Sequence, residues 1–392
     1  VRNSVIVNRG QMYFNQGQDQ RIRQAKQAQD QFARAIGQYH QAIALQPNQY
    51  QAHVNLAQLY QTQGRLGDAL ENLDRAIELH DRDASLYRTR GLLQLRCGNE
   101  QAALDDLDRA IALAPPGKSA NLAADFIERG RILFRRKRYD AALESFEQAQ
   151  RFHPEEFPRA HRLRAEALLE LGQHTEALQA INRNLTRGGD DDHDAYLTRG
   201  LIRSKLARYH EAIADYTLAL DAPPAKGTDP AEIDKIRAKT LAYRGWAYLI
   251  LDAIRVAEHD FDEALKLDDQ NGDAHSGRGN ARIKQGKHES ALVDIEASLK
   301  LGKPSSRLSY NAARCYALAV DAVGKNAAFD RAKLAQAQFY QSRALDLLRA
   351  ALDQVPEAER AAFIKDYVET DPAWLALRRN SRFAEIVASG SR

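Results

Sequence analysis

The chain has 392 residues, and its 56 lysines and arginines against 53 aspartates and glutamates leave a formal net charge of only +3. That balance gives no general attraction to nucleic acid or to an anionic membrane, and no apolar run approaches the ~18 residues that cross a bilayer. Cys97 and Cys315 are too few and too far apart for a disulfide framework or a zinc site. We therefore expect two buried thiols in a cytoplasmic protein.

The first residues, "VRNSVIVNRG", lack the continuous apolar core and cleavage site of a secretory signal. They also lack an initiator methionine, which suggests a piece of a longer protein. Further along, alanine, leucine, glutamine, glutamate and arginine dominate, and the prolines fall between helical patterns. This composition predicts an all-α chain.

A small residue recurs along the chain, often at steps of 34 or 35 residues, with longer steps where segments are inserted. The recurring residues are Gly10, Ala57, Gly91, Gly130, Ala165, Gly200, Gly245, Gly279 and Ala313. Two helical stretches fit each step, and residues 50–83 show the pattern in full. It resembles the tetratricopeptide repeat, whose period is about 34 residues, over nearly the whole chain. The resemblance implies an all-α, right-handed superhelix (solenoid) of stacked helical hairpins.

We expect about nine hairpins in an array over residues 1–355, followed by C-terminal capping helices over 356–392. The predicted hairpins span about 3–47, 50–83, 84–115, 123–156, 158–189, 193–224, 238–271, 272–303 and 306–353. Within the last segment, the spacing of Trp374, Leu377, Phe383 and Ile386 is suited to covering the final apolar face.

About the last 90 residues carry a second resemblance. The stretches "YNAARCYALA", "ALDLLRAAL" and "DPAWLALRRNSRF" resemble the closing part of tetratricopeptide regions in bacterial eukaryotic-like Ser/Thr kinases and related multidomain signalling proteins. The chain has no Gly-rich loop, His-Arg-Asp loop or Asp-Phe-Gly triplet of its own. A kinase domain, if the parent protein has one, would lie outside these residues.

No pattern of catalytic or metal-binding residues stands out. "PPGKSA" lacks the first glycine and the preceding strand of a phosphate-binding loop, and "GGDDDHD" at 188–194 lacks the spacing of a calcium loop. The histidines show no metal-ligand spacing. The sequence therefore predicts no enzyme activity, no metal and no cofactor.

An arginine precedes the recurring small residue in several repeats. In four of these repeats an aspartate stands sixteen residues after the arginine. These pairs are Arg90 with Asp106, Arg199 with Asp215, Arg244 with Asp260, and Arg278 with Asp294. Because a partly buried arginine needs a carboxylate partner, the spacing favours ion pairs between the helices of a hairpin, or to the following repeat, over a ladder for anionic ligands.

In the family that the repeat resembles, a partner binds in a concave groove lined by a few fixed positions of the first helices. Carried over to this sequence, the candidate peptide groove comprises Asn8, Gln11, Asn55, Gln58, Arg88, Arg131, Arg135, Arg159, Arg162, Thr198, Lys205, Tyr243, Trp246, Asn280 and Lys284. Arginines suit carboxylates or phosphates, and an exposed tryptophan suits an apolar anchor. We therefore expect an acidic or phosphorylated protein or peptide partner.

Together these features predict a non-catalytic scaffold that recruits a partner to a larger bacterial signalling or effector protein. An architectural role, through self-association or the spacing of neighbouring domains, is the alternative. Binding of RNA or DNA through the central arginines is a weaker one, because the net charge is close to neutral.

Overall fold

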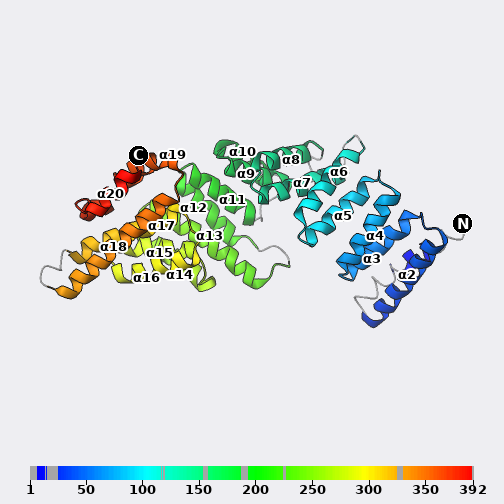
Figure 1. The fold of residues 1–392 in the computed structure, drawn as a ribbon, viewed down its shortest axis with the longest axis horizontal. Coiled ribbons are helices and arrows are strands. Elements are labelled where there is room, and N and C mark those ends of the chain that lie inside the picture. Colours follow the sequence, from blue (N-terminus) through cyan, green and yellow to red (C-terminus); the bar gives the residue numbers. More distant parts are fainter. Residues whose placement is uncertain are drawn as a thin grey trace. The chain divides into compact units, whose positions relative to one another are not determined.

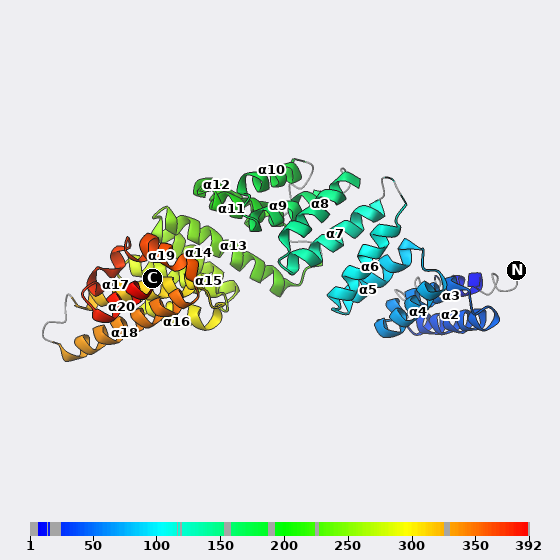
Figure 2. The same ribbon diagram turned by 45° about the horizontal axis from the view of Figure 1, so that its top comes forward.

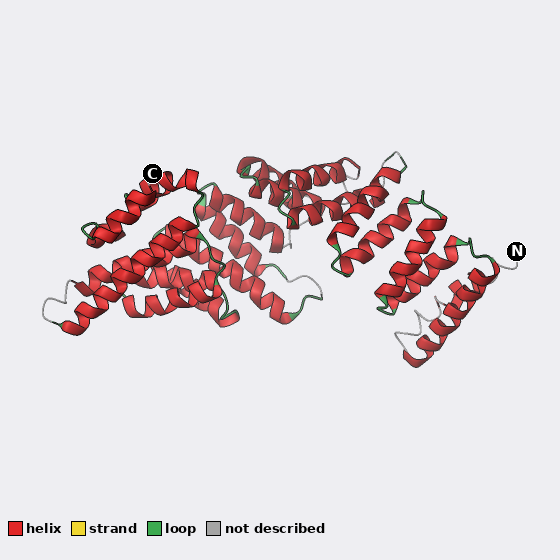
Figure 3. Ribbon diagram, viewed as in Figure 1, coloured by secondary structure: helices red, strands yellow, loops and turns green. Residues whose placement is uncertain are grey.

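The computed structural model describes residues 7–13, 15, 25–115, 117, 120–152, 158–186, 193–223, 227–324 and 330–390. Throughout these ranges the regular secondary structure is helical (Figure 3). The chain divides into two compact units, Val1–Arg187 and Gly188–Arg392.

Unit 1 is a series of antiparallel helical hairpins in chain order (Figure 1). A helical segment at 7–13 and α2 (Ala25–Leu45) precede them, and α2 packs on α3. The hairpins are α3 (Tyr50–Thr62) with α4 (Leu66–Leu79), α5 (Ala84–Arg96) with α6 (Glu100–Leu113), α7 (Ala120–Arg135) with α8 (Tyr139–Phe152), and α9 (Pro158–Glu170) with α10 (His174–Leu185).

Unit 2 continues the same plan and ends in shorter elements. Its hairpins are α11 (His193–Lys205) with α12 (Tyr209–Asp221), α13 (Pro230–Ile250) with α14 (Ile254–Leu267), α15 (Gly272–Lys284) with α16 (His288–Leu301), and α17 (Ser306–Gly324) with α18 (Arg331–Asp353). After them come α19 (Glu357–Phe363), the π-helical turn η1 (Ile364–Val368), the 3₁₀ turn η2 (Pro372–Leu377) and α20 (Ser381–Gly390). The predicted all-α repeat fold is confirmed.

The small residue of each repeat brings the two helices of a hairpin into close contact. A Cβ atom added to Gly130 would lie 2.5 Å from the ring of Phe146, and one added to Gly200 would lie 2.5 Å from the ring of Tyr216. Both rings are fully buried. The aromatic side chain of the second helix therefore fills the space that a side chain on the first helix would take.

The turns between paired helices need a residue with positive φ, which glycine adopts without a steric cost. Gly64 and Gly286 take this place, each with φ of 75°. In three other hairpins the same place holds Lys137, Ala207 and Asp252, with φ of 58°, 58° and 60°. A side chain in this region costs some strain, so tertiary packing fixes these turns against local preference.

The end of unit 2 is closed by the shorter elements, with η2 against α17 and α20 against α18. In the view of Figure 2, α20 lies next to α18. Trp374 is fully buried, and its ring lies 5.6 Å from that of Phe383. The Tyr310 hydroxyl of α17 donates to the carbonyl oxygen of Tyr367 at 2.8 Å. Leu377 and Ile386, which the sequence also assigns to the cap, are buried as well; these last elements thus cover the apolar face of the final hairpin.

The two cysteines lie in different environments. Cys315 is fully buried in α17, and this burial raises the pKa of its thiol to about 12. Cys97 is exposed, so the expectation of two buried thiols is wrong for this residue. The reason is its place at the C-cap of α5, where the helix has already left the core.

This difference predicts the reactivity of the two thiols. At neutral pH, we expect dithionitrobenzoate to modify Cys97 rapidly and Cys315 only after unfolding, because a thiol must ionise and be accessible to react. The measurement is the number of thiolates released before and after addition of urea. A Cys97→Ser variant should release none in the native state; prompt release from that variant would contradict the burial of Cys315.

Candidate functional site

The four arginine–aspartate pairs lie in contact, each between the first and second helices of one hairpin. Arg90 donates to both oxygens of Asp106, at 2.9 and 2.6 Å. Arg199 donates twice to one oxygen of Asp215, at 2.9 and 2.6 Å, and Arg203 donates to the other at 2.6 Å. Both aspartates are buried, Asp215 fully.

The other two pairs, also in unit 2, repeat the two-oxygen contact of Arg90. Arg244 donates to both oxygens of Asp260 at 2.8 Å. Arg278 donates to both oxygens of Asp294, at 3.0 and 2.6 Å, and Arg282 adds a third hydrogen bond at 2.8 Å. These aspartates are also buried. Each buried carboxylate thus has the cationic partner that it needs.

Arg90, Arg244 and Arg278 also reach back to the second helix of the preceding hairpin. Arg90 donates to Asp74 at 2.7 Å, and Arg278 donates to Asp262 at 2.9 Å. Other such contacts join Arg129 to Asp108, Arg164 to Glu147 and Arg244 to Thr217. One guanidinium therefore ties together two second helices through the first helix between them.

The sequence carries a signal for this second contact too, beyond the recurring distance of sixteen residues. An arginine pairs with the aspartate sixteen residues further on, and the acceptor for the next repeat's arginine lies two residues beyond that aspartate. Asp108 thus follows Asp106, and Asp262 follows Asp260. The Asp-x-Asp pattern thus marks one carboxylate acceptor for the repeat's own arginine and one for the arginine of the next repeat. The hydrogen bond to Asp106 raises the pKa of the Arg90 guanidinium, although burial opposes this shift.

At the start of the predicted groove, the amide side chains do not form one open surface. Asn8 and Gln58 are exposed. Gln11 is half-buried, and its side-chain oxygen accepts a hydrogen bond from Tyr39 at 3.4 Å. Asn55 is only 8% exposed and does not line an open groove as expected, because the adjoining residues of α3 are buried in the core.

Arg88, predicted to face the groove, instead makes a two-point ion pair with Asp125 of α7. Both hydrogen bonds are 2.5 Å long, and Asp125 is buried. Burial raises the pKa of the Asp125 carboxyl, and the hydrogen bonds from Arg88 oppose this shift. The pair links the first helices of successive hairpins, and Asp125 was not predictable because its distance from Arg88 matches no repeat spacing.

The other central arginines are also near carboxylates. Arg135 donates to Glu100 at 2.6 Å, and Arg162 donates to Glu166 at 2.5 Å. Arg131, which is more exposed, donates to Glu128 at 3.2 Å. The side chain of Arg159 lies outside the described residues. The central arginines therefore carry less uncompensated charge than the sequence indicated.

In unit 2, the predicted groove residues again divide into buried and exposed ones. Lys205 is exposed. Thr198 and Asn280 are buried, and the Asn280 amide donates to the carbonyl oxygen of Ser276 at 2.8 Å, a turn earlier in α15. Thr198 and Asn280 therefore offer little open surface, and their contact with a partner stays a prediction.

Tyr243 and Trp246 form a half-buried aromatic surface on α13. The Tyr243 ring lies 6.2 Å from that of Tyr216, with the Lys239 ammonium 5.8 Å from its centre. The guanidinium of Arg307, from α17, lies 5.7 Å from the centre of the Trp246 ring. Each half-buried ring thus has a cation over it, and both cations, Lys239 and Arg307, are exposed.

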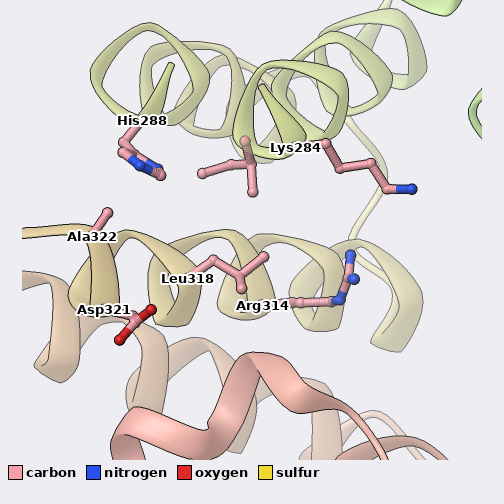
Figure 4. A pocket seen from close by; sticks show the side chains of 7 residues that line it. Lys284, His288, Arg314, Leu318, Asp321 and Ala322 are labelled. Atoms are coloured by element: carbon pink, nitrogen blue, oxygen red, sulfur yellow. The ribbon is translucent and has the colours of Figure 1, made fainter. Parts of the chain in front are cut away.

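A pocket of about 420 Å³ lies between α15, the start of α16 and α17 (Figure 4). Its lining residues are Ile283, Lys284, His288, Arg314, Leu318, Asp321 and Ala322. Of these, only Lys284 was predicted for the groove. Counting repeat positions from Ala313 would have placed Arg314 and Leu318 at the ninth and thirteenth positions, which line the groove in the family that the repeat resembles.

Within the described ranges, no group of three histidine, cysteine, aspartate or glutamate side chains is arranged to hold a metal ion. Residues 187–192, which include most of the aspartate-rich loop, lie outside those ranges. None of the described helices is long and apolar enough to cross a membrane.

Comparison with known proteins supports the repeat pattern. A family model described as a tetratricopeptide repeat matches residues 24–71, 54–118, 127–193 and 244–306, and a second model of that description matches residues 193–226. These ranges cover more than half of the chain.

Among curated proteins, the chain is 24% identical over 306 residues to DnaJ homolog subfamily C member 7 of Mus musculus, covering 74% of this chain and 60% of that protein. It is 23% identical over 261 residues to the Hsp70-Hsp90 organizing protein of Triticum aestivum, covering 63% of this chain and 40% of that protein. The chain thus matches 60% or less of the length of these relatives.

Among solved structures, a tetratricopeptide repeat protein from Parabacteroides merdae aligns with 67% of this chain and 97% of its own, at a TM-score of 0.52 and 16% identity. The C-terminal part of a repeat-containing protein from Cytophaga hutchinsonii aligns with 69% of this chain and 98% of its own, at a TM-score of 0.52 and 14% identity. At these identities the similarity concerns the fold alone.

Proposed function

The chain belongs to the tetratricopeptide repeat family, and from this premise we propose that it is a non-catalytic scaffold that binds a protein or peptide partner. The observation that carries the proposal lies in unit 2, where α13, α15 and α17 pack in sequence. These first helices present aromatic rings and exposed cations together, with a pocket between two of them. Aromatic residues and arginine are the side chains that contribute most to protein interfaces.

We propose an acidic or phosphorylated partner for this surface. Lys239, Lys284 and Arg307 are exposed on the three first helices, whereas Arg88, deeper in unit 1, is neutralised by a buried carboxylate. Charge complementarity therefore favours binding to unit 2 over binding to the central arginines. The wheat relative's name describes an organizer of other proteins, which is in keeping with a scaffold.

The cellular setting is also a proposal. Two unpaired cysteines suit the reducing conditions of the cytoplasm. The resemblance of the C-terminal stretches to repeat regions of bacterial kinases supports a place in a larger bacterial signalling or effector protein.

Charge reversal on unit 2 tests the proposed function. We expect immobilised wild-type chain to retain specific proteins from a bacterial lysate, and a Lys239→Glu/Arg307→Glu variant to lose them, because both cations lie over the aromatic surface. The matched control is Lys300→Glu/Lys303→Glu, with the same change in charge on exposed residues at and beyond the end of α16. The measurement is quantitative mass spectrometry of retained proteins.

Equal recovery by all three forms would overturn binding at this surface. Light scattering of the chain alone separates the alternative roles. A stable oligomer that retains no partner would favour the architectural function, and retention of nucleic acid that falls steeply with salt would favour nucleic-acid binding.

A further inference from the structure

The pocket between α15 and α17 has a cationic end. Figure 4 shows the Lys284 ammonium and the Arg314 guanidinium on facing helices at the same end of the pocket. Their carboxylate partners, Asp252 at 2.8 Å and Asp371 at 2.6 Å, are not among the residues that line it. Two like charges that face one shared space repel each other, and an anion between them would remove that repulsion.

Neither ion pair uses up the donors of these cations. Arg314 donates to Asp371 through Nε, and no described residue accepts from its two terminal nitrogens. Asp252 is largely exposed, so its pair with Lys284 is a weak surface contact that the lysine can exchange for another anion. Both cations are themselves about one-third exposed, which leaves them accessible to a ligand.

The rest of the pocket is apolar at its centre and polar at its far end. Ile283 and Leu318 are its larger apolar lining residues, and Leu318 lies between the two ends (Figure 4). His288, Asp321 and Ala322 lie at the end away from the two cations (Figure 4), so the Asp321 carboxylate does not neutralise them. The Nδ1 atom of His288 is buried and has no hydrogen-bond partner among the described residues.

A second hollow, of about 450 Å³, adjoins the first through His288 and Ala322 and reaches Gln336 and Tyr340 of α18. The two hollows share lining residues, and each has the volume of a pocket that can take a side chain of a bound ligand. An isolated small anion would leave most of this space unfilled.

We propose that this pocket binds an anionic side chain of a peptide segment between Lys284 and Arg314, with an adjacent aliphatic side chain on Ile283 and Leu318. The anion is a carboxylate or a phosphate ester, since both suit a lysine and an arginine together. The proposal rests on the proposed function and deepens it, because it names the chemistry that one part of the scaffold recognises.

Three fluorescein-labelled pentapeptides test this assignment, each with the sequence Ala-Ala-X-Leu-Ala and with X as glutamate, phosphoserine or glutamine. By fluorescence polarisation, we expect at least one anionic peptide to bind roughly tenfold more tightly than the glutamine peptide, as loss of a charge-assisted contact predicts. Comparison of the glutamate and phosphoserine peptides identifies the anion. Equal binding of all three, or no binding, would overturn the proposal.

A Lys284→Gln variant should abolish most of that tenfold preference while leaving thermal stability unchanged, because Lys284 contributes only an exposed ion pair to the fold. Asp252→Asn is the matched control, since it removes the same ion pair and keeps a residue that tolerates positive φ. We expect it to bind the anionic peptide at least as tightly as wild type. Weaker binding by Asp252→Asn, or unchanged preference in Lys284→Gln, would count against the pocket.

These results are separable from the test of the scaffold function. If the pocket assignment fails, capture of proteins through the aromatic surface at Lys239 and Arg307 is unaffected. If no protein is captured but the peptides bind as expected, the scaffold proposal fails and the anion site stands.

Discussion

Replacing Asp106 with alanine should lower the free energy of unfolding by about 3 kcal/mol, the lower part of the range for breaking a buried ion pair. The substitution leaves the partly buried Arg90 guanidinium without its two-point partner in the same hairpin. Asp74 still accepts from Arg90, which keeps the loss below the top of that range. Urea unfolding followed by circular dichroism measures the change, and hydrogen exchange of α5 and α6 amides shows whether it is local.

The neighbouring Asp105 provides the control, because it is exposed and accepts a hydrogen bond from Gln101 across one turn of α6. Asp105→Ala should change stability by no more than about 0.5 kcal/mol. Arg90→Ala should also destabilise, and the double variant Arg90→Ala/Asp106→Ala should lose less than the sum of the two single changes. Strict additivity would show that the two side chains do not stabilise the fold as a pair.

The repeat itself was predictable because its signals are local and recur. One small residue per period, an aromatic or large apolar residue sixteen further on, and turn glycines such as Gly64 together define a hairpin. The Arg90–Asp106 contact follows from the same regularity, since a spacing that recurs four times places the two side chains on facing helices of one hairpin.

Features that depend on a single neighbour were not predictable in this way. Asp125 reaches Arg88 from the next hairpin, after an insertion that breaks the repeat spacing. Asn55 has a groove position in the repeat but is buried. The repeat position fixes the direction in which a side chain points, whereas its burial depends on the neighbouring side chains. The pocket beside Arg314 depends on how α17 lies against α15, which the hydrophobic pattern of either helix alone does not specify.

Replacing Trp374 with alanine should destabilise unit 2 by about 3–5 kcal/mol, the usual cost of emptying a fully buried tryptophan site. The ring packs on Phe383, and its Nε1 donates to the Tyr310 hydroxyl at 3.4 Å. Loss of the ring therefore removes apolar contact from η2, α20 and α17 at once. Because a repeat array is stabilised by nearest-neighbour interfaces, the damage should begin at the α17–α18 hairpin.

Cys315 reports on this hairpin directly, because it belongs to the same buried cluster as Trp374. In a Cys97→Ser background, Trp374→Ala should speed native-state labelling of Cys315 by roughly two orders of magnitude, as a loss of about 3 kcal/mol in opening free energy requires. Leu375→Ala is the matched control, since Leu375 is the next residue along the chain and is 61% exposed. Equal labelling rates in the two variants would mean that η2 does not hold the final hairpin closed, and that the array ends at α18 without a cap.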